Sequence, residues 1–499
     1  MTGEREESMR MPRGPLHQKL LDYGASDFYG FHMPGHKRQI EGAGSSYLLD
    51  ITEIDGFDDL HHPKDSGILV QAQERAASVY GAEETHFLVN GSTAGVLSAI
   101  SACTSFEGEL LLARNSHRSA YHAAALLHLD VHYLYPQVLE EWGISGGIFP
   151  EDVDKCLRKH RGIEAVFVTS PTYEGICLDV RAVAEICHRH GVPLIVDQAH
   201  GAHFPFSAYF PEDALKAGAD VVIQSVHKTL PALTQTALLH VQGTRVDRQR
   251  LNEYLSVYQS SSPSYLLMAS TDDCMELLER FGEEIFTAYA RRLELFREGC
   301  KDLGELKLLG TELVGRAGIF DFDRSRLVIC DQKKALTGFE LSRRLRVQAH
   351  LEMEMAAGFY AVGISSVADG KKELARLSAA LHGIDQSLQE ERKNCRPDGR
   401  LQRSKERQLS RAQVALPLWQ APEREKEWIE VKGCENRISA SYLYLYPPGI
   451  PLIVPGERLT ADLCDEIEDA LMGERELHGL DGQGRLAVVT EQQARCLRE

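Results

Sequence analysis

The 499-residue sequence lacks the marks of a membrane or secreted protein. No run of about 18 uncharged apolar residues appears, so the sequence predicts no membrane-spanning helix. Residues 1–20 are polar and of mixed charge, without the apolar core of a secretory signal. The 11 cysteines are scattered and include no CxxC pair, which predicts neither a disulfide framework nor a zinc site. We therefore expect a protein of the reducing cytoplasm.

Basic residues are also scarce, with 55 Lys and Arg against 73 Asp and Glu and a net charge of −18. A phosphate surface would repel such a chain, so we expect no nucleic-acid or membrane partner. Residues 393–412 are a basic exception that also contains Pro and Gly, and we interpret them as a solvated loop or insertion.

Between residues 85 and 241 the sequence alternates short apolar segments with amphipathic ones. The apolar segments are continuous and bounded by turn residues, which is typical of strands buried on both faces. Strand–helix–strand order then predicts a parallel or mostly parallel sheet covered by helices. The predicted strands are 85–90, 109–114, 130–136, 165–170, 193–197 and 219–225, and the predicted helices are 118–128 and 180–190.

Two later segments have a distinct character. Residues 266–304 carry apolar side chains at helical spacing among many charges, which predicts one long helix. Tyr442–Glu457 is apolar, aromatic and rich in proline. We expect this segment to be ordered and buried, because its apolar surface is too large to leave in water.

Three polar groups follow predicted strands. Asp197 ends the apolar run LIVD, and Lys228 lies just past the next apolar run. The turn Asn90–Gly95 follows a third predicted strand and opens a helix. Ligands bind at the carboxyl ends of strands in open α/β sheets. A lysine can hold an aldehyde cofactor as a Schiff base, a carboxylate can pair with a pyridinium, and a helix N-terminus can bind phosphate. Together the three indicate pyridoxal phosphate (PLP), although each alone is more often a cap, a turn residue or a surface residue.

Eight motifs in one order extend this interpretation, and through them the sequence resembles the ornithine/lysine/arginine decarboxylase family of fold-type I PLP enzymes. The resemblance covers nearly the whole chain. The motifs are FHMPGHKR (Phe31–Arg38), DDLHHP (Asp58–Pro63), LVNGSTAG (Leu88–Gly95), RNSHRS (Arg114–Ser119), SPTYEG (Ser170–Gly175), DQAHGAHF (Asp197–Phe204), SVHKTLPALTQTA (Ser225–Ala237) and YPPGIPLIVPGE (Tyr446–Glu457).

The resemblance implies roles for five residues around the reacting atoms. Lys228 would carry the Schiff base, Asp197 would pair with the pyridinium nitrogen, and His117 would stack on the cofactor ring. His200 would lie close to the cofactor and His227 next to the reacting carbon. On sequence grounds alone, a histidine that opens a helix, as His117 does, is more often a cap or a surface residue.

The resemblance also implies that Ser92, Thr93 and Ser225 hold the cofactor phosphate. The chain departs from the family at two places. Many relatives have Glu where this chain has Gln198, and many have Asn where it has Ser170. The second difference leaves the partner of the cofactor's phenolic oxygen open.

The implied architecture is a fold-type I α/β large domain with a mostly parallel sheet and a smaller α+β C-terminal domain. We predict an N-terminal arm at 1–30, a PLP-binding domain at 31–275 and a C-terminal decarboxylase domain at 276–499. Only 30 residues precede the first motif, so we expect a short form without the N-terminal wing domain of larger relatives. Because family sites form between two subunits, we expect a homodimer or a dimer-based oligomer.

The function implied is decarboxylation of a basic L-amino acid, arginine or lysine and less so ornithine, to an amine of the polyamine pathway. The alternatives are a fold-type I aminotransferase and a catalytically silent PLP-fold regulator. The cationic end of the substrate needs a carboxylate, for which Glu457, Asp58 and Asp59 are candidates; each could equally cap a loop. Arg437 could be part of a structural ion pair or could bind a carboxylate.

Overall fold

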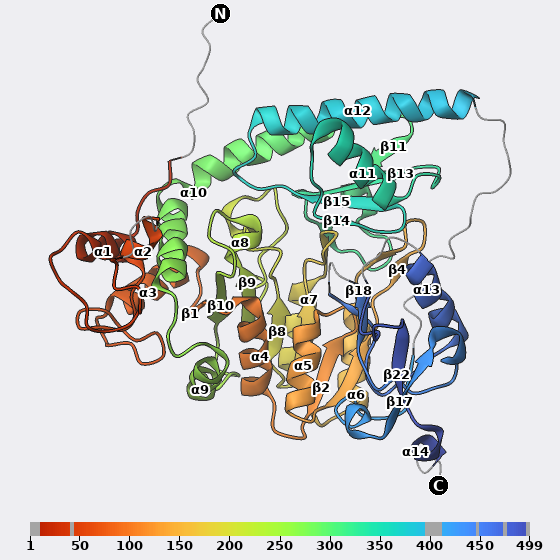
Figure 1. Cartoon of the computed structure of the whole chain (residues 1–499), viewed down its shortest axis with the longest axis horizontal. Helices are drawn as coiled ribbons and strands as arrows, with labels where there is room; N and C mark the ends of the chain where they lie inside the picture. Colours follow the sequence, from red (N-terminus) through yellow and green to blue (C-terminus); the bar gives the residue numbers. More distant parts are fainter. Residues whose placement is uncertain (1–9, 40–43, 395–411, 446–448, 473–476, 496–499) are drawn as a thin grey trace, which may run out of the picture.

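The structure is a computed structural model that describes residues 10–39, 44–394, 412–445, 449–472 and 477–495. It has a large central sheet, a smaller antiparallel sheet beside two long helices, and a C-terminal unit of short strands (Figure 1). No helix in the described parts of the chain is long and apolar enough to cross a membrane.

The central sheet has seven strands in the order β1-β10-β9-β8-β6-β2-β3. The five adjacent strands β9, β8, β6, β2 and β3 are parallel to one another, whereas β10 is antiparallel to both β9 and β1. The predicted mostly parallel sheet is therefore confirmed. The strands are β1 (Glu84–Leu88), β2 (Glu109–Ala113), β3 (Asp130–Leu134), β6 (Ile163–Thr169), β8 (Leu194–Asp197), β9 (Val221–Ser225) and β10 (Ala237–Val241).

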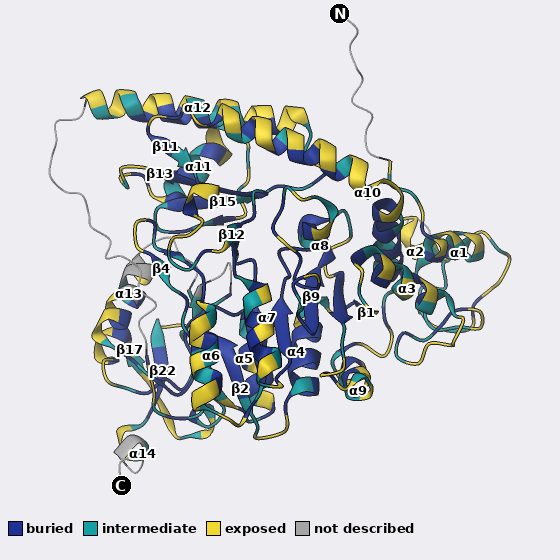
Figure 2. Cartoon of the chain, turned by 180° about the vertical axis from the view of Figure 1, so that it is seen from behind, coloured by how far each residue is buried: buried dark blue, intermediate teal, exposed yellow. Residues whose placement is uncertain are grey.

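Helices cover both faces of this sheet (Figures 1 and 2). In α7, the buried residues Val180, Val183, Ala184 and Cys187 recur at helical spacing, and its outer face is exposed. One hydrophobic cluster contains residues of α4 (Gly91–Cys103), α5 (Arg118–Leu126) and α9 (Arg248–Tyr258). The other contains residues of α3 (Ile68–Tyr80), α6 (Pro150–Lys159), α7 (Val180–Arg189) and α10 (Tyr265–Gly299).

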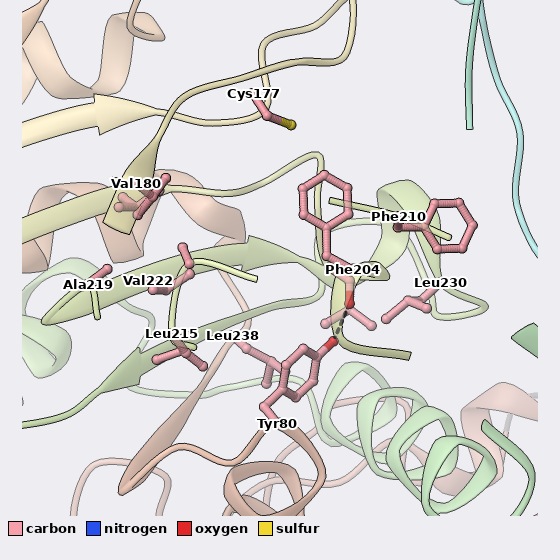
Figure 3. Packing of buried hydrophobic residues seen from close by; sticks show 14 of the residues in the cluster. Tyr80, Cys177, Val180, Phe204, Phe210, Leu215, Ala219, Val222, Leu230 and Leu238 are labelled. Atoms are coloured by element: carbon pink, nitrogen blue, oxygen red, sulfur yellow. Dashed lines mark hydrogen bonds between the residues drawn. The ribbon is translucent and has the colours of Figure 1, made fainter. Parts of the chain in front are cut away.

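The second cluster extends under the segment that follows β8 (Figure 3). Phe204, Phe210 and Leu230 pack there with Tyr80 of α3. The Tyr80 hydroxyl donates a 2.8 Å hydrogen bond to the carbonyl oxygen of Ala202. This packing fixes the backbone between the end of β8 and the short helix α8 (Val226–Thr229), where the candidate site lies.

The smaller sheet is antiparallel, in the order β11-β13-β15-β14, and it packs against α10, α11 and α12. The predicted helix at 266–304 is confirmed as α10, which ends earlier than predicted, at Gly299. Because α10 runs through position 275, the domain division predicted there remains a prediction. The elements are β11 (Leu306–Leu308), β13 (Arg326–Asp331), β14 (Met355–Ala356), β15 (Tyr360–Ile364), α11 (Gly338–Ala349) and α12 (Lys371–Asn394), with β12 (Asp321–Phe322) paired to β7 (Ile176–Cys177).

The C-terminal unit has its own small core of apolar residues. Tyr446–Pro448 and most of the basic run, 395–411, lie outside the described residues. The described parts of the predicted buried segment, around β18 and β19, are mostly buried, as expected. The elements are β16 (Gln413–Val414), β17 (Lys426–Glu430), β18 (Leu443–Leu445), β19 (Pro451–Ile453), β20 (Glu457–Arg458), α13 (Ala461–Met472), β21 (Leu477–His478), β22 (Arg485–Val489) and α14 (Glu491–Arg495).

Short elements complete the described chain. Near the N-terminus, α1 packs against α10 and α2. The remaining helices and strands are α1 (Pro15–Gly24), α2 (Ser46–Leu49), β4 (Val138–Leu139) and β5 (Ile144–Ser145), with 3₁₀ turns at Phe204–Phe206, Thr311–Leu313, Ala421–Glu423 and Val431–Gly433.

Candidate active site

The site lies where β8 and β9 end at the carboxyl edge of the central sheet. Asp197 is the last residue of β8, and Lys228 lies in α8, directly after β9. Because β8 and β9 are parallel neighbours, their ends meet at one edge. Asp197 is only 6 % exposed, and its Oδ1 accepts a 3.0 Å hydrogen bond from the Ala199 amide. The two residues predicted from strand ends are thus brought together.

The amine of Lys228 contacts a histidine whose orientation is fixed by an arginine. Lys228 Nζ lies 2.9 Å from His200 Nε2. On the other side of the ring, Arg326 Nη2 donates to His200 Nδ1 at 3.0 Å and to the His200 carbonyl oxygen at 2.7 Å. A guanidinium can only donate, so Nδ1 is the acceptor and the neutral ring carries its proton on Nε2. His200 then donates to Lys228, whose nitrogen must accept and is therefore an uncharged amine.

The electrostatics of the site agree with this assignment. Burial lowers the pKa of Lys228 below its ordinary value, Arg326 lowers it further, and Asp197 and Glu354 oppose the shift. Burial likewise holds the pKa of His200 well below its ordinary value, and the positive charge of Arg326 adds to this effect. An uncharged lysine amine is the form that can attack an aldehyde.

His117 caps a helix and also lies within the electrostatic reach of Lys228. It precedes α5, and its Nδ1 accepts a 3.3 Å hydrogen bond from the Ser119 amide. Burial lowers the pKa of His117 to about 3, so the ring is uncharged at neutral pH. His117 is therefore the helix cap that the sequence raised as one interpretation, and its place against the cofactor ring remains a prediction.

Two of the three predicted phosphate ligands meet at the start of α4. Ser92 Oγ and Ser225 Oγ are 2.7 Å apart, although the two residues are 133 positions apart in sequence. Gly91 has a φ of +70°, a conformation that side chains other than glycine rarely adopt. A Cβ on Gly95 would lie 2.6 Å from the Leu88 side chain, so glycine lets α4 approach the sheet closely. Thr93 lies exposed on the same turn of α4.

His227 is partly buried beside Lys228. Its Nδ1–H donates a 2.8 Å hydrogen bond to the Thr236 carbonyl oxygen. In the neutral ring this leaves Nε2 without a proton. Burial lowers the pKa of His227, so the neutral form is the one present at neutral pH.

Three residues near Lys228 were missed by sequence reasoning. Arg326 is fully buried, and its Nε and Nη1 have no hydrogen-bond partner among the described residues. Tyr173 stacks edge-on against His200, with ring centroids 4.6 Å apart, and its hydroxyl donates to Glu354. Arg326 and Glu354 lie outside every motif. The sequence offers one signal for Arg326, a charged residue at the start of the apolar run Arg326-Leu-Val-Ile-Cys, and none for Glu354.

The carboxylates considered for the substrate have structural partners instead. Both oxygens of Glu457 accept hydrogen bonds from Arg114, at 3.0 and 3.1 Å, and the pair is almost fully buried. Asp58 is buried and accepts from the Leu69 amide at the start of α3, at 2.9 Å. Asp59 accepts from the His61 amide at 2.8 Å. Asp58 and Asp59 are the loop caps that the sequence left as the alternative, and Glu457 is the partner in a buried ion pair.

Arg437 and Ser170, whose roles the sequence left open, also have structural partners. Arg437 donates to Glu427 and to the Val489 carbonyl oxygen, so it is a structural ion-pair residue. Ser170 Oγ accepts a 3.1 Å hydrogen bond from the Leu178 amide. That bond fixes the loop after β6.

Comparisons with known proteins match this chain to one family. A model described as "Orn/Lys/Arg decarboxylase, major domain" matches residues 14–324, and one described as the C-terminal domain of the same family matches residues 410–472. The arginine decarboxylase of Bacillus subtilis is 30% identical over 464 residues, covering 90% of this chain and 91% of its own. The arginine decarboxylase of Halalkalibacterium halodurans is 30% identical, covering 97% and 99%.

A solved structure confirms the fold class. Lysine decarboxylase A from Pseudomonas aeruginosa superposes with a TM-score of 0.79 at 22% identity, covering 96% of this chain and 80% of that chain. At this identity the likeness concerns the fold alone. It agrees with the predicted large α/β domain joined to a smaller C-terminal one.

Proposed function

This chain belongs to the Orn/Lys/Arg decarboxylase family, and we propose on that premise that it converts L-arginine to agmatine and carbon dioxide. The observation that carries the reaction is the partly buried, uncharged amine of Lys228 beside His200 and Asp197. Arginine is favoured because relatives named arginine decarboxylases match nearly the whole chain at higher identity than the lysine decarboxylase structure. Agmatine would enter the polyamine pathway.

The residues present fit PLP as the cofactor. The turn that opens α4 and the hydroxyls of Ser92 and Ser225 form a cradle for a phosphate, because helix N-terminal amides and small hydroxyls bind such anions. Asp197 would hold the pyridinium nitrogen, and His117 would lie against the ring. When bound, PLP supplies an electron sink for the pair of electrons left by the departing carboxyl group.

The chain's own residues would then manage protons and position. After carbon dioxide leaves, the Cα atom needs a proton. We assign its return to Lys228 Nζ, which would first take up a proton from the α-ammonium group of the incoming substrate. His227 is less suited, because its neutral ring has its proton committed to Thr236. Arg326 would keep His200 in one tautomer and so hold the Lys228 amine in place.

Glu354 is the carboxylate best placed to bind the cationic end of the substrate. It is exposed, it influences the pKa of Lys228, and it accepts a hydrogen bond from Tyr173, which contacts His200. A planar guanidinium would match this carboxylate with two parallel hydrogen bonds.

Kinetics with three amino acids would test the substrate. We expect kcat/KM for arginine to exceed that for lysine and ornithine by at least about tenfold, the difference that about 1.4 kcal/mol of pocket contacts gives. Replacement of Glu354 by Gln should raise KM for arginine, whereas Glu352→Gln, which removes an exposed carboxylate paired with Arg346, should not. A preference for lysine or ornithine would reassign the substrate within the family.

The functional unit is proposed to be a homodimer. The segment from Phe28 to Met33, where the first motif begins, exposes several large apolar side chains: Phe28, Tyr29 and Met33 are 55–70 % exposed, and Phe31 is 94 % exposed. Such a concentration of apolar surface favours a second copy of the chain as its cover. The nine described cysteines are free thiols, in keeping with a proposed cytoplasmic location.

A further inference from the structure

A second cluster of chemically active side chains lies far from the cofactor edge of the sheet. Glu109 is the first residue of β2, His132 lies in the edge strand β3, and His160 follows the last residue of α6. Since β2 runs parallel to β6, and β6 to β8, the start of β2 lies at the opposite edge from Asp197. No step of the proposed reaction uses these residues.

The three side chains converge. One ligand atom of each, a carboxylate oxygen and two imidazole nitrogens, lies within 4.8 Å of the other two. Glu109 Oε2 is 2.9 Å from His132 Nε2. The rings of His132 and His160 have centroids 3.9 Å apart and are tilted by 30°. Within the described chain this is the one group of three or more such residues with this geometry.

The surrounding backbone holds the cluster in place. A Cβ on Gly162 would lie 2.1 Å from Glu109 Oε1, so glycine at this position leaves room for the carboxylate. The amide of His160 donates a 2.9 Å hydrogen bond to the Cys156 carbonyl oxygen and so closes the last turn of α6. Pairing of β2 with β3 fixes Glu109 relative to His132. The three ligands therefore come from rigid elements, which reduces the ordering cost of binding.

We propose that Glu109, His132 and His160 form a binding site for one divalent transition-metal ion of the zinc class. Two imidazoles and one carboxylate are a ligand set that zinc and its neighbours prefer, and three protein ligands leave one position for water. Bound there, the ion would tie the edge strand β3 to β2 and to the end of α6.

A metal ion binds the lone pair of a neutral imidazole. Besides Glu109, the charged residues nearest the two histidines are Asp130, which lies opposite Glu109 in the strand pair, and Lys159, which directly precedes His160.

Zinc titration of the purified, PLP-loaded enzyme against a chromophoric chelator tests the proposal. We expect one site per chain, weakened at least about tenfold by His132→Ala, His160→Ala or Glu109→Gln, since each removes a ligand from a three-ligand set. The matched control is His382→Ala, because His382 forms a similar 2.9 Å pair with Asp302 without a second histidine. Decarboxylation in metal-free buffer should be unchanged in all four variants and reports that each is folded.

Electron paramagnetic resonance with Cu²⁺ as the probe identifies the ligands. The spectrum of the unsubstituted enzyme should carry the nitrogen couplings of two imidazoles, and either histidine substitution should remove one of them. Equal zinc affinity in the unsubstituted enzyme and the ligand variants, or a copper spectrum unchanged by both histidine substitutions, would overturn the proposal.

Discussion

Arg326 determines which of His200 and Lys228 donates the hydrogen bond between them. It is fully buried, it donates to His200 Nδ1, and its charge lowers the pKa of Lys228. The arrangement keeps Lys228 uncharged by two means, a repulsive charge nearby and a histidine that is obliged to donate. A buried cation would be costly on its own; Asp323, whose Oδ2 lies 3.6 Å from Arg326 Nε, compensates for it.

Replacement of Arg326 by Gln should make the apoenzyme capture PLP more slowly at neutral pH. Arg326 lowers the pKa of Lys228, so its removal raises that pKa and a smaller fraction of the amine is uncharged at a given pH. The pH at which capture becomes half-maximal should therefore move upward. Stopped-flow absorbance of the bound cofactor across a pH series measures this directly.

Two further variants separate this effect from misfolding. Arg326→Lys keeps the charge and should keep the pH midpoint near that of the unsubstituted enzyme. Arg324→Gln removes a guanidinium two residues away that donates to the Tyr209 carbonyl oxygen, and it should leave the midpoint in place. An Arg326→Gln midpoint equal to that of the Arg324→Gln control would contradict the role assigned to Arg326.

At the scale of elements, the start of α4 and the end of β9 are brought together by two serines. We expect Ser92→Ala and Ser225→Ala each to raise the Kd for PLP by roughly tenfold or more, because a hydrogen bond to a charged group contributes about 1.5–3 kcal/mol. Equilibrium reconstitution of the apoenzyme measures the Kd. Ser98→Ala, which removes a buried hydroxyl of α4 without a partner among the described residues, is the control and should change the Kd little. An equal change in all three variants would mean that the effect is general to the helix.

The ion pair between Arg114 and Glu457 joins β2 to the C-terminal unit. Arg114 also donates to the carbonyl oxygens of Pro451 and Leu452, at 2.7 and 3.0 Å. Glu457→Gln should lower the free energy of unfolding by about 3 kcal/mol, because it leaves a buried guanidinium without its counter-charge. Denaturant unfolding measures the loss. The KM for arginine should stay unchanged; a large rise in KM without a loss of stability would restore Glu457 as a substrate ligand.

The sequence predicted the strands and helices of the large sheet better than it predicted contacts between distant residues. The continuous apolar runs ending at Asp197 and Ser225 identified buried strands, because a strand covered on both faces has no polar side to interrupt it. The same logic placed Asp197 and Lys228 at one sheet edge. Arg326 and Glu354 could not be found this way, because they come from the smaller sheet and reach the site only through tertiary packing. The pairing of Glu457 with Arg114 joins residues 343 positions apart, a contact that no local pattern specifies.

At the scale of the whole molecule, the exposed aromatic residues around Phe31 predict self-association. Phe31→Asp should shift the purified protein from dimer toward monomer, because it places a charge in the apolar surface that a second copy would cover. Light scattering coupled to size-exclusion chromatography measures the mass. Phe106→Asp is the control, since Phe106 is also largely exposed but lies between α4 and β2, away from this motif. An unsubstituted enzyme that is monomeric at all concentrations would contradict the dimer.

The order of motifs, rather than any one of them, made the family recognisable from sequence. The choice among arginine, lysine and ornithine was beyond it, because that choice depends on pocket geometry, and the carboxylate that we propose for it comes from a distant segment of the chain. Glu354, next to β14 of the smaller sheet, contacts Tyr173 from the loop that follows β6 of the large sheet.

The central claim, decarboxylation of arginine with Lys228 as the essential amine, is tested most directly by one measurement. L-arginine labelled in its carboxyl carbon is incubated with the purified, PLP-loaded enzyme and with its Lys228→Ala variant, and the released label is followed together with the amine product. The account predicts labelled carbon dioxide and agmatine in equal amounts from the enzyme, and at least about a thousandfold less from the variant, since it lacks the group that forms the covalent link. Label retained in a keto acid, or equal release by the two proteins, would contradict it.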